Sequence, residues 1–224
     1  GALVDFAQQQ VMKVGTRTSS SRMVLGPELA RGAIDAMNTE TVEDGVSTGF
    51  ADLDAMISGL QRGDLAIVAG RPSSGKTALA VNVATHAAFR GGKSVVVFSL
   101  EMSRKGIMDR ILSSESKVDG QKIRTHHLSE RDYAALSATL GAVHESRLAI
   151  DDSSTLTALE IGRRARKIKV QHGLDLIVVD YLQLIRGHGR FENRNLEVGD
   201  ISRTFKAVAK ALKESGKGSL DYRQ

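Results

Sequence analysis

Residues 63–83 read GDLAIVAGRPSSGKTALAVNV, and this stretch decides the fold. Its centre, residues 70–77, fits the phosphate-loop pattern G-x-x-x-x-G-K-[ST] at every fixed position. The apolar run at residues 65–69 predicts a buried strand, and the Ala-, Val- and Leu-rich residues 77–89 predict a helix. Strand, glycine loop and helix therefore follow one another in the order that a phosphate-binding loop requires.

The residue types of this loop suit the triphosphate of ATP. Gly70 and Gly75 allow backbone N–H groups to close around a phosphate, and the helix N-terminus adds positive potential. In such loops the lysine reaches the β- and γ-phosphates and the hydroxyl ligates Mg²⁺, which are the roles we expect for Lys76 and Thr77. A chance match in a Gly/Ser-rich turn is the disfavoured alternative. The predicted nucleotide-binding residues of the loop are Gly70, Ser73, Ser74, Gly75, Lys76, Thr77 and Ala78.

Composition narrows the class of protein. The 224 residues, 41% of them hydrophobic, are enough for one substantial core. The absence of cysteine excludes both a disulfide framework and a thiolate metal site. No apolar run reaches the about 20 residues that span a bilayer, so we expect a cytoplasmic protein without a membrane segment. A net charge of +5 allows an anionic partner such as nucleic acid but does not require one.

The rest of the chain alternates between predicted strands and predicted helices. Strands are expected at residues 94–99, 148–150 and 176–179, the last being the clearest buried run. Helices are expected at residues 103–114, with Ser103 as the N-cap, and from Ser129, which opens a helix with Asp132, to about Val143. Two more are expected at residues 157–171 and 196–213. This alternation predicts an α/β fold with a mostly parallel sheet flanked by helices.

Residues 1–45 differ from the rest and predict a helical linker or arm. A polar, Ser-rich segment at residues 15–22 separates two helix-compatible segments at 3–14 and 27–37. Their apolar residues form only part of a stripe, so we expect the arm to dock on a neighbour or on a missing N-terminal domain. The predicted domains are the arm, residues 1–45, and the α/β domain, residues 46–224.

Two carboxylates follow predicted strands. Asp180 ends the run at residues 176–179, at the edge where open α/β sheets bind ligands, and is predicted to order the Mg²⁺ ligands beside Thr77. A cap on the following turn is the alternative. Glu101 lies just past the strand at residues 94–99 and could orient and deprotonate an attacking water. It could equally complement the dipole of the next helix, and spacing alone leaves both interpretations open.

Residues 186–200, RGHGRFENRNLEVGD, predict a mobile loop because they are polar, arginine-rich and contain glycine. Candidates for phosphate contacts and base stacking on single-stranded DNA are Arg186, Arg190, Phe191 and Arg194. A solvated loop without a ligand has about equal weight. The basic helix face at residues 163–169 is interpreted as solvent-facing. The six histidines form no ligand-like cluster, so no metal other than nucleotide-bound Mg²⁺ is predicted.

Several segments resemble the ATPase domain of DnaB-type replicative helicases. They are residues 47–50 with 52–54, 59–61, 70–77, 99–103, 119–124, 150–152 and 179–184. Residues 99–103 read SLEMS, and residues 180–184 read DYLQL. The resemblance runs from about residue 46 to residue 212, with the motifs in the family's order. Recombinase-type and clock-type ATPases of the same RecA-like fold lack SLEMS and DYLQL in this form.

The resemblance implies a RecA-like P-loop NTPase that assembles as a homohexameric ring and hydrolyses ATP between subunits. It implies movement along single-stranded DNA in the 5′-to-3′ direction during DNA replication, with primase and a helicase loader as partners. In the family's pattern Glu101 is the general base, Lys76 and Thr77 bind phosphate and Mg²⁺, and Asp180 is the metal-site acid. Arg110 matches a family arginine that contacts nucleotide phosphate, a surface arginine being its alternative. Residues 1–45 resemble the linker whose helix packs on the adjacent subunit.

The resemblance ends near Leu212. The family continues with a strand carrying a glutamine sensor, a DNA-contacting loop and an arginine finger, none of which residues 214–224 resemble. We therefore expect this polypeptide to bind ATP but to hydrolyse it slowly, since such arginines contribute orders of magnitude in rate. A RecA- or RadA-like recombination ATPase, and a truncated nucleotide-binding subunit without unwinding activity, stay open as alternatives.

Overall fold

A computed structural model describes residues 24–38, 45–185 and 193–214. The chain divides into two compact units, Gly1–Glu43 and Asp44–Gln224. In the first unit, helix α2 (Gly26–Asn38) confirms the helix predicted at residues 27–37, and its apolar side chains Leu29, Ile34 and Met37 are exposed. The helix predicted at residues 3–14 lies outside the described residues. All the other elements named below belong to the second unit.

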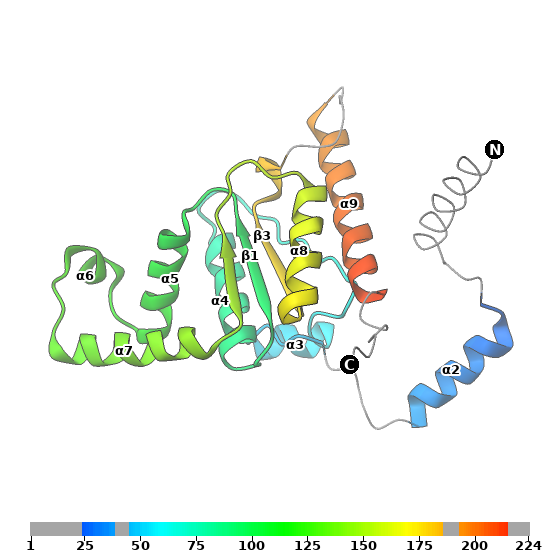
Figure 1. Cartoon of the computed structure of the whole chain (residues 1–224), viewed down its shortest axis with the longest axis horizontal. Coiled ribbons are helices and arrows are strands. Elements are labelled where there is room, and N and C mark those ends of the chain that lie inside the picture. Colours follow the sequence, from blue (N-terminus) through cyan, green and yellow to red (C-terminus); the bar gives the residue numbers. More distant parts are fainter. Residues whose placement is uncertain (1–23, 39–44, 186–192, 215–224) are drawn as a thin grey trace, which may run out of the picture. The chain divides into compact units, whose positions relative to one another are not determined.

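The described part of the second unit contains three parallel strands, β1 (Val95–Ser99), β2 (Leu148–Asp151) and β3 (Leu176–Asp180), in the order β2-β1-β3 (Figure 1). The central strand β1 reads VVVFS and is buried along its whole length, as expected for a parallel strand covered on both faces. The register pairs Val95 with Leu148 and Leu176, and Ser99 with Asp180. The predicted α/β fold with a parallel sheet is confirmed.

Helices cover both faces of this sheet. Because side chains alternate along a strand, Val95 and Val97 point to α4 (Lys76–Phe89), whereas Val96 and Phe98 face α8 (Ala158–His172) and α9 (Arg194–Glu214). Helix α5 (Arg104–Ser116) packs beside α4 and against β2. The remaining elements are α3 (Ala51–Ile57), α6 (Gly120–Thr125), α7 (Glu130–Glu145) and the short 3₁₀ helix η1 (Leu182–Leu184).

The strand predicted before the phosphate loop is absent, which corrects the sequence interpretation. Residues 65–69 adopt no regular structure, and Ile67 and Val68 are 61% and 57% exposed. A strand forms only where another strand takes up its N–H and C=O groups, and within the described residues β3 pairs with β1 alone. For the same reason β3 is an edge strand, and residues 176–179 are half-buried rather than fully buried as predicted.

The predicted helix starts at Ser103 and Ser129 are confirmed, and the helix predicted from Thr157 begins there with a cap that was not predicted. Ser103 accepts a hydrogen bond from the Gly106 N–H at 3.2 Å, while Ser129 and Thr157 open α7 and α8 with capping boxes. Helix α9 begins earlier than expected, so residues 194–200 are helical and not part of a loop. Asn193 accounts for this start, because its side chain accepts from the Leu196 N–H at 3.0 Å. No helix within the described part of the chain is long and apolar enough to cross a membrane.

Candidate nucleotide-binding site

Sheet topology brings the predicted site residues to one edge. Helix α4 ends at Phe89, only a short turn before β1 begins at Val95, so the two run in opposite directions. The start of α4 therefore lies near the ends of the parallel strands β1 and β3, against which the helix packs. Glu101 follows the end of β1, and Asp180 ends β3. The phosphate loop, Glu101 and Asp180 thus gather at the carboxyl edge of the sheet.

The phosphate loop has a backbone that depends on its glycines. Gly75 has a φ of 89° in the left-handed region, and Ser73 has a φ of 62°. A Cβ atom at Gly70 would lie 2.7 Å from the Ser74 hydroxyl oxygen, so a larger residue there would require the Ser74 side chain to move. The Lys76 ammonium group donates to the carbonyl oxygens of Gly70 at 2.9 Å and Arg71 at 2.8 Å. The lysine charge is therefore held directly over the loop.

The first turn of α4 has the properties of an anion site. No side chain caps the helix, and no acidic residue occurs in its first turn. The first N–H groups of a helix have no partner within the helix, and the helix dipole adds positive potential at this end. Thr77 is half-buried in this turn, with its hydroxyl available as an oxygen ligand. This end of α4 can therefore receive a phosphate group.

Asp180 presents a buried carboxylate oxygen. The residue is 7% exposed, and its Oδ2 has no hydrogen-bond partner within the described residues. Burying such an oxygen without a partner costs free energy, which a cation or an ordered water would recover. The Thr77 hydroxyl and the Asp180 carboxylate are hard oxygen donors, so they fit Mg²⁺. The described residues contain no group of three or more His, Cys, Asp or Glu that could hold a metal ion.

Glu101 lies in a short, tightly fixed segment. The buried Ser99 hydroxyl donates to the Met102 carbonyl at 2.8 Å and accepts from the Met102 N–H at 3.2 Å. The Leu100 N–H donates to the Asp180 carbonyl at 2.8 Å, which extends the ladder between β1 and β3. Glu101 itself is exposed and makes no hydrogen bond or ion pair within the described part of the chain.

The other predicted contact residues are less closely grouped. Arg110 lies on the exposed side of α5, about two turns from its start, so it is not part of the edge itself. Arg194 pairs with Glu197 and donates to the Gln183 carbonyl, so its guanidinium is engaged within the chain. Arg186, Arg190 and Phe191 lie outside the described residues.

Within the predicted basic face, Arg163 and Arg166 are exposed, as expected, but Lys169 is half-buried and donates to the Leu212 carbonyl.

Sequence reasoning gave no role to Asp152, although it too follows a strand. Its carboxylate accepts from the Arg104 N–H at 2.9 Å and from Arg104 Nε at 3.1 Å. The backbone N–H of Arg104, and then its guanidinium, hold the pKa of Asp152 below its usual value. Like Asp180, Asp152 lies at the carboxyl end of a strand, and this position could have identified it from the sequence.

The segment before α3 is tied to the phosphate-loop helix. Asp54 accepts from the Ser47 hydroxyl at 2.7 Å and from the Thr48 N–H at 2.8 Å, and the Ser47 oxygen lies 3.3 Å from His86 Nε2 on α4. A Cβ at Gly49, whose φ is 82°, would lie 2.6 Å from the His86 ring. Burial raises the pKa of Asp54, but hydrogen bonds from Ser47, Thr48 and Gly49 prevail and lower it. These contacts attach residues 47–54 to α4.

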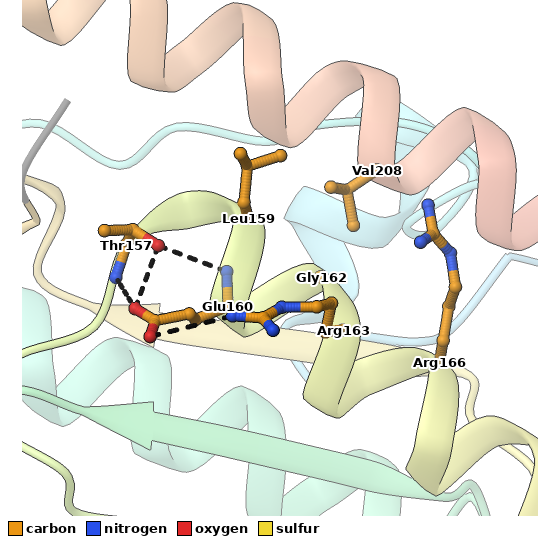
Figure 2. A pocket seen from close by; sticks show the side chains of 7 residues that line it. All are labelled: Thr157, Leu159, Glu160, Gly162, Arg163, Arg166 and Val208. Carbon is orange, nitrogen blue, oxygen red and sulfur yellow. Dashed lines mark hydrogen bonds and ion pairs between the residues drawn. The ribbon is translucent and has the colours of Figure 1, made fainter. Parts of the chain in front are cut away.

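A pocket of about 430 Å³ lies elsewhere, between α8 and α9 (Figure 2). Its lining residues are Thr157, Leu159, Glu160, Gly162, Arg163, Arg166 and Val208. It opens where Gly162 faces the Val208 side chain, on the face of the sheet opposite α4. None of these residues belongs to the phosphate loop or its neighbouring carboxylates, so this pocket is not the nucleotide site.

The fold and this edge of the sheet define a P-loop nucleotide-binding α/β protein. The sequence model of the DnaB-like helicase C terminal domain matches residues 45–215, so the chain belongs to that family. The expected family resemblance is confirmed.

Individual relatives agree. The replicative DNA helicase DnaB of Geobacillus stearothermophilus is 39% identical over 215 residues, covering 94% of this chain and 47% of the relative. DnaB of Pasteurella multocida is 50% identical over 171 residues, covering 75% and 37%. The chain thus spans about half the length, or less, of these curated relatives.

Solved structures give the same result. One is a DnaB-like replicative helicase described with its interactions with primase, with a TM-score of 0.75 and 26% identity over 92% of this chain and 50% of the other. Another is described as an ATPase domain, with a TM-score of 0.75 and 29% identity over 83% of this chain and 66% of the other. Both carry the same α/β core, which supports the RecA-like P-loop fold.

Proposed function

We propose that this chain is the ATPase core of a DnaB-type replicative helicase, which binds and hydrolyses ATP with Mg²⁺. The observation that carries the proposal is the register of Ser99 with Asp180. That register sets Glu101 and the partner-free Asp180 oxygen at the edge where the uncapped start of α4 lies. Family membership supports the same interpretation of the site.

Each residue has a distinct chemical task in this proposal. Lys76 exchanges its two neutral carbonyl partners for charged phosphate oxygens, which form stronger hydrogen bonds. The first-turn N–H groups of α4 bind the same phosphates. Glu101 takes the proton of the attacking water, and Arg110 contacts a phosphate. Thr77 and Asp180 would hold Mg²⁺, which would offset the phosphate charge when bound.

The biological task is the coupling of ATP hydrolysis to 5′-to-3′ movement on single-stranded DNA in a hexameric ring during replication. The curated relatives are named as replicative DNA helicases, which supports this role and a cytoplasmic location. DNA contacts are proposed for Arg186, Arg190, Phe191 and Arg194. Primase and a helicase loader are the proposed protein partners, and one structural relative is described with primase.

Replacing the proposed base tests the chemistry. We expect Glu101→Gln to lower hydrolysis by about 10²–10⁴-fold, because it removes the proton acceptor but not the phosphate contacts. Hydrolysis is measured in a single turnover with the chain in excess over ATP, and binding is measured with a fluorescent ATP analogue. Glu130→Gln is the matched control, because Glu130 is an exposed glutamate in the first turn of α7. Unchanged hydrolysis in Glu101→Gln would refute the assigned base.

Assembly and DNA coupling need a separate measurement. We expect Mg²⁺ and ATP to shift the chain to a ring in solution, detected by light scattering, and single-stranded DNA to accelerate hydrolysis. ATP binding without assembly or DNA stimulation would instead identify a nucleotide-binding subunit that lacks helicase activity.

A further inference from the structure

The segment that carries Glu101 is held by a carboxylate from another strand. Asp152, just after β2, accepts from the backbone N–H of Arg104 at 2.9 Å and from its guanidinium at 3.0 and 3.1 Å. Arg104 is the first residue of α5, three positions after Glu101. The contact joins positions 48 residues apart in the sequence, so it is a tertiary restraint on the first turn of α5.

The side-chain hydrogen bonds made by Ser99 and Ser103 are local, and the Leu100 N–H is held by the Asp180 carbonyl at 2.8 Å. Ser99 closes the turn onto Met102, and Ser103 caps α5 through the Gly106 N–H. Both would travel with the segment if it moved as a unit, whereas Asp152 fixes it to the neighbouring strand.

Asp152 is itself well anchored. The adjacent Asp151 accepts from Arg164 of α8 at 2.5 Å and from the Ser153 hydroxyl at 2.7 Å. Burial raises the pKa of Asp151, but the hydrogen bonds from Ser153 and Arg164 prevail and hold it below its usual value. The connection from β2 to α8 therefore offers a fixed carboxylate to α5.

We propose that Asp152 is a positioning residue for Glu101, because it fixes the first turn of α5 and with it the direction in which Glu101 leaves the sheet edge. The inference rests on the proposed role of Glu101 as general base. Without Asp152 the Arg104 N–H loses its partner and residues 101–103 gain freedom. Catalysis is sensitive to such freedom, since a misplacement of about 1 Å can cost about 10²-fold in rate.

A purely structural helix cap is the competing explanation, and Asp132 provides its matched control. Asp132 serves the start of α7, where it accepts from the Ser129 N–H at 3.0 Å and hydroxyl at 2.8 Å and pairs with Lys122 at 3.5 Å. Like Asp152 it joins a helix start, but it belongs to a helix that carries none of the proposed catalytic residues. Asp132→Ala therefore reports the cost of losing a helix-end carboxylate away from the site.

The first experiment compares Asp152→Ala with Asp132→Ala by single-turnover ATP hydrolysis and by titration with a fluorescent ATP analogue. We expect Asp152→Ala to hydrolyse ATP about 10-fold more slowly with its affinity for the analogue unchanged, and Asp132→Ala to match the parent in both. Asp152→Asn keeps one acceptor and should fall between. An unchanged rate in Asp152→Ala, an equal loss in Asp132→Ala, or a matching loss of affinity would overturn the proposal.

The second experiment separates this proposal from the assignment of the base. If Asp152 acts through Glu101, adding Asp152→Ala to Glu101→Gln should not slow the residual hydrolysis further. A further loss of about 10-fold on the Glu101→Gln background would show that Asp152 acts by another route. If Glu101→Gln alone leaves hydrolysis unchanged, the assignment of Glu101 as the base fails instead.

Amide hydrogen exchange then tests the positioning itself, because it needs no turnover. The Met102 and Arg104 amides should exchange faster in Asp152→Ala and at the parent rate in Asp132→Ala. Parent-like exchange of both amides in Asp152→Ala would sink the inference.

Discussion

Helices α4 and α5 both begin at the carboxyl edge of the sheet, yet their first turns are opposites. Helix α4 starts at a left-handed Gly75 with no side-chain cap and no acidic residue in its first turn. Helix α5 is capped by Ser103 through the Gly106 N–H, and Asp152 takes up the Arg104 N–H. One helix keeps its N–H groups for a ligand, whereas the other bonds them to acceptors of the chain itself.

The difference shows how one structural feature supports two tasks. Any helix start has positive potential and unpaired N–H groups, and an uncapped start leaves all of these groups available to a phosphate. A capped start is instead a rigid support, and here it supports the segment that carries Glu101. The start of α4 and the start of α5 can each be altered by substitution. A matched substitution in α5 or in α7 then serves as the control.

Among the changes to these two helix starts, the largest effect is expected for Lys76→Ala. It removes a charged donor from the loop, and hydrogen bonds to charged groups contribute about 1.5–3 kcal/mol, so affinity for a fluorescent ATP analogue should fall about 10- to 100-fold. Lys105→Ala is the control, because Lys105 is an exposed lysine in the first turn of α5. An equal loss of affinity in both variants would mean that net charge, and not the open start of α4, governs binding.

A smaller loss is expected for Gly75→Ala. The φ of Gly75 is 89°, and an L-residue in the left-handed region costs about 1–2 kcal/mol, so affinity for the ATP analogue should fall about 5- to 30-fold. A Cβ there would meet no atom within 4 Å, so strain and not collision is the cause.

Gly141→Ala in α7 is the contrasting control for the same substitution. A Cβ at Gly141 also meets nothing within 4 Å, and this helical position should gain about 0.5–1 kcal/mol in the free energy of unfolding measured with urea. Gly75→Ala with parent-like affinity would contradict the need for a left-handed residue in the loop.

Ser103→Ala should lower the free energy of unfolding by about 0.5–2 kcal/mol, because it removes the cap of α5. Ser129→Ala removes the corresponding cap of α7 and should cost a similar amount. Only Ser103→Ala should also slow ATP hydrolysis, because α5, and not α7, directly follows the segment that contains Glu101. Urea unfolding and single-turnover hydrolysis measure the two effects, and equal hydrolysis in both variants would remove the functional part of the comparison.

Local patterns predicted much of this edge of the sheet. The phosphate loop, the cap at Ser103 and the acid that ends β3 each depend on residues close together in the sequence, and these patterns were sufficient. The unpaired state of residues 65–69 was not predictable in this way, because an apolar run becomes a strand only beside another strand. Their exposure in the structure follows from the open edge of β3.

The hydrogen bonds between Arg104 and Asp152 were not predictable from the sequence, for a related reason. Hydrophobic periodicity places Asp152 at the end of a strand and Arg104 at the start of a helix. It does not show that the segment after β2 contacts the start of α5. That contact depends on the order β2-β1-β3, which no local signal in this sequence gives.

The smallest expected effect is a dependence of α5 on pH that α4 lacks, because residues 70–77 contain no carboxylate. In the folded state, hydrogen bonds from the Arg104 N–H and then from its guanidinium hold the pKa of Asp152 below its ordinary value of 3.8. A lowered folded pKa means that the stabilising contribution is complete above pH 3.8 and is lost as the pH falls through the folded pKa.

Asp152→Asn should therefore be less stable than the parent near neutral pH, and the difference should close in acid. Urea unfolding of both proteins at a series of pH values measures this difference, and the Arg104 amide proton shift reports the titration directly. A midpoint at or above 3.8 for that shift would show that the carboxylate does not bond the start of α5 as described.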